Sequence, residues 1–109
     1  MIRVLVTGAA GKMGLEVLKA VWLADETELV GAVDVQGAGR DIGLMMGMGE
    51  LGLSLRSDLA GALEDLRPDV MVDFTSPQVV AENVNLALKA GVRPVVGTTG
   101  LDVAELDRA

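Results

Sequence analysis

The chain has 109 residues, of which 50% are apolar and 2% aromatic, and its formal net charge is −7. This length suits one domain with a substantial core, and the negative charge argues against nucleic acid as a partner, because phosphate contacts need rows of Lys and Arg. The sequence has no Cys and no His, which excludes disulfides and leaves a zinc centre without its usual ligands.

No stretch reaches the roughly 18 uninterrupted apolar residues that a membrane-spanning helix requires. The first residues, Met1, Ile2 and Arg3, lead directly into a strand pattern rather than into a secretory leader. We therefore expect a cytoplasmic protein without a membrane partner.

Apolar runs alternate with helical patterns in the first half of the chain. Residues 2–7 read as a buried strand, residues 12–24 as a helix with apolar positions 13, 17, 18, 21 and 22 on one face, and residues 29–35 as a second strand. Residues 36–52 hold six glycines and three methionines, which predicts a mobile loop with one helical turn near 41–45. Residues 53–56 read as a short third strand, and residues 59–66 as a helix capped by Ser57 or Asp58.

The second half continues the alternation. Residues 70–74 read as a fourth strand, residues 77–90 as a helix, residues 94–96 as a fifth strand and residues 102–109 as the start of another helix. This order predicts an α/β fold: a Rossmann-like, doubly wound parallel sheet with strand order 3-2-1-4-5, truncated after the fifth strand. Ligands of such sheets bind at the carboxyl ends of the first and fourth strands, where the winding reverses.

Residues 8–14, GAAGKMG, place glycines three apart between the first strand and the first helix. Gly8 allows a sharp turn, Gly11 leaves space for a pyrophosphate, and Gly14 lets the helix pack closely on the strand. The amino end of the helix adds free N–H groups. The alternative is a tight turn that serves packing alone.

Four further residues complete this predicted cofactor site. Ala10 and Met13 belong to the same loop, although the side chain of Met13 falls on the expected core face. Lys12 is interpreted as a cation that faces the phosphates. Asp34 comes twenty residues after Gly14, where a carboxylate can accept hydrogen bonds from an adenosine ribose; the alternative is a turn residue at a strand end.

Four motifs resemble the amino-terminal half of the 4-hydroxy-tetrahydrodipicolinate reductase (dihydrodipicolinate reductase) family. They are VTGAAGKMG at 6–14, GAVD at 31–34, VDFTSP at 72–77 and GVRPVVGTTG at 91–100. The resemblance implies a dinucleotide-binding domain over residues 1–109 with NADH or NADPH as cofactor. It also implies an oxidoreductase that reduces 4-hydroxy-tetrahydrodipicolinate on the route to diaminopimelate and lysine, and a homotetramer when the protein is full length.

The resemblance adds residues at the nicotinamide end of the site. Phe74 is either core or an aromatic wall beside the nicotinamide, and Thr75 either caps the next helix or offers its backbone to the ligand. Gly97, Thr98 and Thr99 form a turn or a cradle for the nicotinamide and its ribose. The family's second domain, with a His-His motif, a lysine and a Ser-Gly-Thr turn, has no counterpart here, so we expect no catalytic residue in this segment.

Two other functions remain open at this point. One is a stand-alone dinucleotide-binding or sensing module without catalysis. The other is a different oxidoreductase, such as a short-chain dehydrogenase or a homoserine-type enzyme, which ranks lower because such enzymes lack the paired DFT and GTTG motifs.

Overall fold

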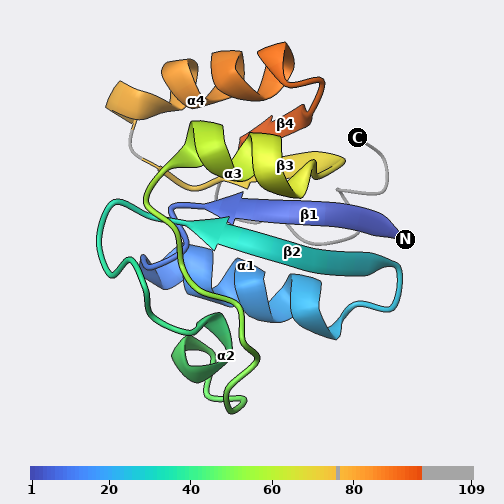
Figure 1. The fold of residues 1–109 in the computed structure, drawn as a ribbon, viewed down its shortest axis with the longest axis vertical. Helices are drawn as coiled ribbons and strands as arrows, with labels where there is room; N and C mark the ends of the chain where they lie inside the picture. Colours follow the sequence, from blue (N-terminus) through green and yellow to red (C-terminus); the bar gives the residue numbers. More distant parts are fainter. Residues whose placement is uncertain (76, 97–109) are drawn as a thin grey trace.

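The computed structural model describes residues 1–75 and 77–96. Its centre is a parallel sheet of four strands in the order β2-β1-β3-β4 (Figure 1). The strands are β1 (Ile2–Thr7), β2 (Thr27–Val33), β3 (Val70–Asp73) and β4 (Arg93–Val96). The predicted parallel α/β architecture is confirmed, and β1 and β3, the first and fourth strands of the prediction, are neighbours.

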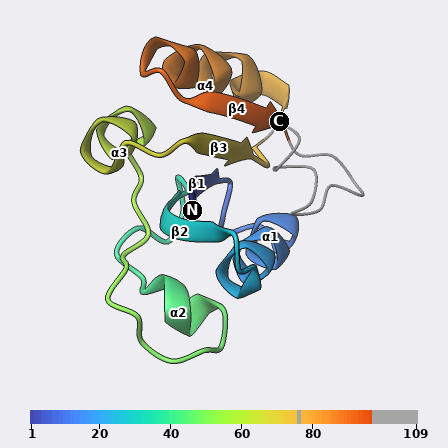
Figure 2. The same cartoon turned by 90° about the vertical axis from the view of Figure 1, so that its right-hand side faces the viewer.

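Helices cover both faces of the sheet (Figure 2). Helix α1 (Lys12–Leu23) packs on one face, where Leu18 and Val21 join Val4 and Val6 of β1 in the core. Helices α3 (Leu59–Leu66) and α4 (Pro77–Lys89) lie on the other face, where a second apolar cluster includes Leu5 and Met71. Because β1 and β3 have apolar side chains on both faces, they read as continuous apolar runs in the sequence.

The predicted third strand, residues 53–56, is wrong as a strand. Arg56 forms one parallel bridge with Val33 of β2, and Ser54 forms one antiparallel bridge with Asp41. The residues before Arg56 hydrogen-bond to their own loop, since the amide of Leu55 donates to Arg40 and the amide of Ile42 donates to Leu53, both at 2.8 Å. A short stretch that changes partner cannot build a continuous ladder.

The glycine-rich segment contains the predicted helical turn, α2 (Ile42–Met45). Asp41 begins this turn, and its carboxylate accepts hydrogen bonds from the amides of Leu44, Leu51 and Gly52 at 3.1, 3.0 and 2.8 Å. One side chain therefore joins the start of the segment to its end.

The buried stripe of α1 differs from the predicted one. Gly14, Leu18 and Val21 are buried, whereas Met13 is 46% and Trp22 41% exposed. The first turn faces the protein through Gly14, so the prediction that the Met13 side chain lies in the core is wrong.

Helix α3 ends at Leu66, and its C-cap residue Arg67 adopts a left-handed conformation with φ of 46° immediately before Pro68. This end agrees with the predicted stop at 66. Within residues 1–75 and 77–96, no helix combines the length and apolar character that crossing a membrane needs. Ser76, the predicted turn at 97–100 and the predicted helix at 102–109 lie outside the described residues.

Candidate functional site

The glycine loop leaves β1 in a sharp turn at the carboxyl edge of the sheet. Gly8 has φ of +78°, a conformation that side chains with a β-carbon rarely adopt. The amides of Gly8 and Ala9 both donate to the carbonyl of Val33, at 2.9 and 3.2 Å. The loop is thereby fixed to the end of β2 before α1 begins.

The three glycines meet different surroundings. A β-carbon on Gly8 would lie 2.7 Å from the carbonyl atoms of Phe74, and one on Gly14 would overlap the carbonyl oxygen of Gly8. Among the described residues, a β-carbon on Gly11 would meet only that oxygen, at an ordinary 3.6 Å. Packing between these residues therefore explains two of the glycines but not Gly11, whose Cα faces open space within the described part of the chain.

The amino end of α1 faces this space. Its N-cap residue is Gly11, no side chain of the described residues caps its first-turn amides, and the first turn holds no acidic residue. The helix dipole and the first-turn N–H groups make this end a favourable place for an anion. The side chain of Lys12, the first residue of the helix, is exposed and adds a positive charge here.

Asp34 follows β2 beside the loop. Its Oδ2 accepts from the amide of Ala10 at 2.9 Å and its Oδ1 from the amide of Gln36 at 3.0 Å. The amide of Ala10, predicted to contact the cofactor, is thus bonded to Asp34 in this structure. Since a carboxylate offers about four acceptor positions, both oxygens keep capacity for the hydroxyls of a ribose.

These elements surround a crevice of about 520 Å³ at the carboxyl ends of β1 and β2, closed on the far side by the starts of α3 and α4. Phe74 and Thr75, both half-buried, line it from the turn after β3. Among the described residues, the charged side chains that line it are three carboxylates, Asp34, Asp58 and Glu82. The structure thus brings Gly8, Gly11, Asp34, Phe74 and Thr75 together, whereas Gly97, Thr98 and Thr99 lie outside the described residues.

Sequence reasoning missed the residues contributed by α3, α4 and the last position of β3. Asp58 was considered only as a cap, yet it makes no capping bond and lines the crevice. Glu82 and Asn83 lie one turn into α4, and no local motif marks them. Asp73 had a usable signal, because an Asp two residues before a Thr at a strand end is typical of a side chain that bonds its own turn.

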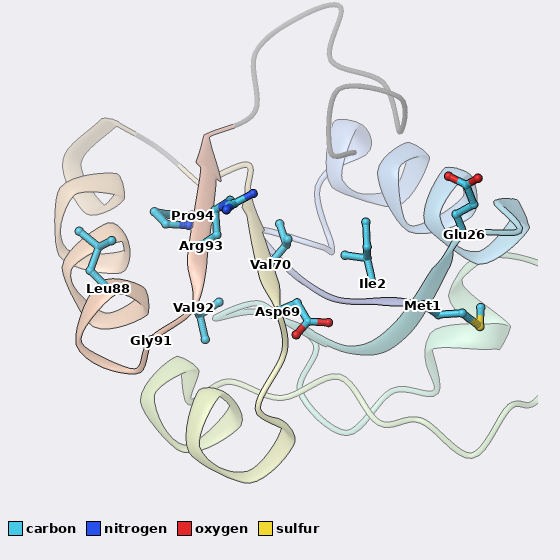
Figure 3. Close-up of a pocket in the computed structure, with 10 residues that line it drawn as sticks. All are labelled: Met1, Ile2, Glu26, Asp69, Val70, Leu88, Gly91, Val92, Arg93 and Pro94. Carbon is cyan, nitrogen blue, oxygen red and sulfur yellow. The ribbon is translucent and has the colours of Figure 1, made fainter. Parts of the chain in front are cut away.

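A larger hollow, of about 850 Å³, lies at the opposite end of the sheet (Figure 3). Its lining comes from the start of β1, the start of β3 and the turn between α4 and β4, and includes Asp69, Arg93 and Leu88. The carboxylate of Asp69 already accepts from the amide of Arg3 at 2.8 Å. Since parallel sheets bind ligands at their carboxyl ends, the smaller crevice is the candidate site.

The sheet order, the helices on both faces and the glycine loop at the winding reversal define a Rossmann-type domain. The family described as "Dihydrodipicolinate reductase, N-terminus" matches residues 2–109. The chain belongs to this family.

Two relatives named 4-hydroxy-tetrahydrodipicolinate reductase illustrate the similarity. The protein of Desulfitobacterium hafniense (strain DSM 10664 / DCB-2) is 50% identical over 106 residues, which are 96% of this chain and 40% of that protein. The protein of Thermosynechococcus vestitus is 49% identical over 110 residues, with 97% and 40% covered. This chain therefore spans about 40% of the length of the curated relatives it matches.

Two solved structures are also similar to this chain. Dipicolinate-bound dihydrodipicolinate reductase from Paenisporosarcina sp. TG-14 superimposes with a TM-score of 0.71 at 34% identity, covering 99% of this chain and 41% of that one. Scyllo-inositol dehydrogenase from Lactobacillus casei, solved with NAD(H) and scyllo-inositol, gives a TM-score of 0.71 at 16% identity over 99% of this chain and 31% of that one. At such low identity the second likeness shows the fold alone.

Proposed function

We propose that this chain is the nicotinamide-dinucleotide-binding domain of a reductase that acts on 4-hydroxy-tetrahydrodipicolinate, on the route to diaminopimelate and lysine. The observation that carries the proposal is the open space at Gly11 in front of an uncapped helix end, in a chain that belongs to the family. The relatives' names supply the substrate and the reaction type.

Each part of the site has a role in holding the cofactor. The pyrophosphate would lie against Gly11 and the first-turn amides of α1, with Lys12 beside it, and Asp34 would accept from the adenosine ribose. When bound, the nicotinamide supplies the hydride. The chain's own contribution is to bind and orient the dinucleotide, because the lining of the described crevice presents neither a Lys nor an Arg for proton delivery.

We also propose that NADH is favoured over NADPH. The carboxylates of Asp34, Asp58 and Glu82 give the crevice one sign of charge, and such a cleft disfavours an additional anion. Two like charges 4 Å apart repel by about 1 kcal/mol even in bulk water. The cation of the following loop, Arg40, is absent from the crevice lining and packs against Gly37, where an added β-carbon would be 3.1 Å from its Cδ.

The proposal extends to parts of the protein beyond this chain. Since the relatives are longer, we expect a further domain that holds the substrate, a homotetrameric assembly and a cytoplasmic location. The mass of the full-length protein measured by light scattering in solution tests the assembly, and a monomer would contradict it.

Calorimetric titration with NADH tests the binding function. Wild type is expected to bind one NADH per chain, and Gly11→Val to bind at least tenfold more weakly with an unchanged circular dichroism spectrum, because the valine would occupy the pyrophosphate position. Ala20→Val, which adds a similar bulk at an exposed position of the same helix outside the crevice lining, serves as the control. Equal affinity in Gly11→Val and wild type would contradict the proposed site.

A further inference from the structure

A buried carboxylate ends β3 directly beneath the turn that lines the crevice. Asp73 is 1% exposed and is paired with Thr7 of β1 and Val96 of β4. Its Oδ1 accepts a hydrogen bond from the amide of Thr75 at 2.7 Å and a second, short one from the hydroxyl of the same residue. One carboxylate oxygen therefore fixes both the backbone and the side chain of Thr75.

The other oxygen of Asp73 makes this arrangement costly. Oδ2 is fully buried and accepts no hydrogen bond from the residues that the structure describes. A buried polar atom without a partner lowers stability, and a charged one does so more strongly. Stability alone therefore does not explain why the turn is held by a carboxylate at this position.

The turn that Asp73 holds is in contact with two other parts of the site. The hydroxyl of Thr75 accepts from Nδ2 of Asn83 on α4, at 3.3 Å. On the other side, the backbone of Phe74 and Thr75 lies so close to Gly8 that a β-carbon there would be 2.7 and 3.0 Å away. A displaced Thr75 would therefore shift both the glycine loop and the α4 wall of the crevice.

We propose that Asp73 is a positioning residue for the cofactor. It holds Thr75 in one orientation before the ligand arrives, so that Phe74 and Thr75, the glycine loop and α4 together present a preformed crevice. An acceptor oxygen already in place fixes the amide and hydroxyl of Thr75, and preorganised groups bind ligands more tightly because less order is lost on binding. This inference rests on the proposed function, since the ligand it serves is the dinucleotide.

Three substitutions at Asp73 separate placement from charge. Asp73→Asn keeps an acceptor oxygen for Thr75, Asp73→Ala removes it, and Asp73→Glu keeps the charge but moves it by one methylene. Asp69→Asn, immediately before the opposite end of β3, removes one carboxylate outside the crevice lining and is the matched control. NADH affinity is measured by calorimetry, and the free energy of unfolding by urea titration.

We expect NADH affinity to fall more than fivefold in Asp73→Ala and Asp73→Glu, and less than fivefold in Asp73→Asn and Asp69→Asn. The NADH affinity should depend on whether an acceptor oxygen lies where Oδ1 of Asp73 lies. It should not follow the ranking of the folded variants by free energy of unfolding. A folded Ala or Glu variant that binds within fivefold of wild type would overturn the proposal, as would a folded Asn variant that loses more than fivefold.

A measurement on the wild-type protein without cofactor covers the case in which variants do not fold. The amide hydrogen of Thr75 should exchange with solvent at least tenfold more slowly than in an unstructured peptide, because Asp73 already holds it. Exchange at the unstructured rate would refute preorganisation. A wild-type chain with a protected Thr75 amide that binds no NADH would instead refute the proposed function and leave the turn geometry in place.

Discussion

Gly11 and Gly14 belong to one loop, yet the surrounding protein restricts only the second of them. A β-carbon on Gly14 would overlap the carbonyl oxygen of Gly8 and lie 2.8 Å from Cα of Ala9, whereas one on Gly11 would be accommodated. We predict that Gly14→Ala destabilises the fold by about 2 kcal/mol or more and that Gly11→Ala changes stability by less than about 1 kcal/mol. Urea titration measures both, and equal losses would contradict the assignment of separate roles.

Asp34 is predicted to contribute to the choice between NADH and NADPH. Replacing it by Ala should weaken NADH binding, because the ribose loses an acceptor, and should bring NADPH closer to NADH, because one repulsive charge is removed. Salt should raise the relative affinity of NADPH in wild type by screening the carboxylates of the crevice. Glu64→Gln, an exposed charge on α3 away from the crevice, is the control. A tenfold NADPH preference in wild type, unaltered in Asp34→Ala, would refute this role.

The carboxylate of Asp41 joins separate parts of the segment between β2 and α3 by hydrogen bonds. Its pKa is lowered below the ordinary value of 3.8, chiefly by the amide of Leu51 and further by those of Leu44, Gly52 and Gly43, while partial desolvation acts in the opposite direction. Because the pKa of Asp41 is lower in the folded state than in the unfolded state, its ionised carboxylate stabilises the fold. This stabilisation is complete above the unfolded pKa and is lost as pH falls through the folded pKa.

We therefore predict that Asp41→Asn destabilises the fold at neutral pH, since the amide of Asn would face the donating N–H of Gly52. The difference in free energy of unfolding between wild type and variant should shrink as pH is lowered below about 4. Urea titrations from pH 7 down to pH 3 measure it, with Glu50→Gln on the same segment as control. A difference that stays constant over this range would show that the charge of Asp41 is not responsible.

The strands illustrate what a sequence pattern can and cannot predict. β1 and β3 are buried on both faces, so their apolar runs marked them without ambiguity. Residues 53–56 also alternate in the way a half-buried strand does, with Leu55 buried between two more exposed neighbours. Residues 53–55, however, pair with the loop that precedes them, and only Arg56 of this stretch pairs with β2. An alternating apolar pattern does not show which segment will be the hydrogen-bonding partner.

The candidate site was predictable where local geometry determines the residue. The turn at Gly8 and the helix contact at Gly14 follow from backbone requirements that only glycine meets, and Asp34 follows from its place after a strand. Asp58, Glu82 and Asn83 reach the crevice only because α3 and α4 pack beside each other on the same sheet face. Such residues depend on tertiary structure and leave no trace in spacing.

For the whole molecule, we predict binding without turnover. The 109-residue chain should bind NADH but not oxidise it in the presence of 4-hydroxy-tetrahydrodipicolinate, since it spans about 40% of the length of its relatives and the lining of the crevice, as far as the structure describes it, presents neither a Lys nor an Arg. Absorbance at the NADH band follows the reaction, with the full-length protein as the positive control. Saturable oxidation by this chain alone would contradict the need for a further domain.

The left-handed conformation of Arg67 after α3 marks a position where a substitution should stabilise the fold. A residue with a β-carbon costs about 1 to 2 kcal/mol in this conformation, and glycine avoids that cost while adding some entropy to the unfolded chain. Arg67→Gly should therefore raise the free energy of unfolding by about 0.5 to 1 kcal/mol, as urea titration would show, and a decrease would contradict this. Since Arg67 lies outside the crevice lining, the stabilised background would offset part of the loss caused by substitutions at Asp73 or Gly14 and raise the folded fraction of those variants in binding measurements.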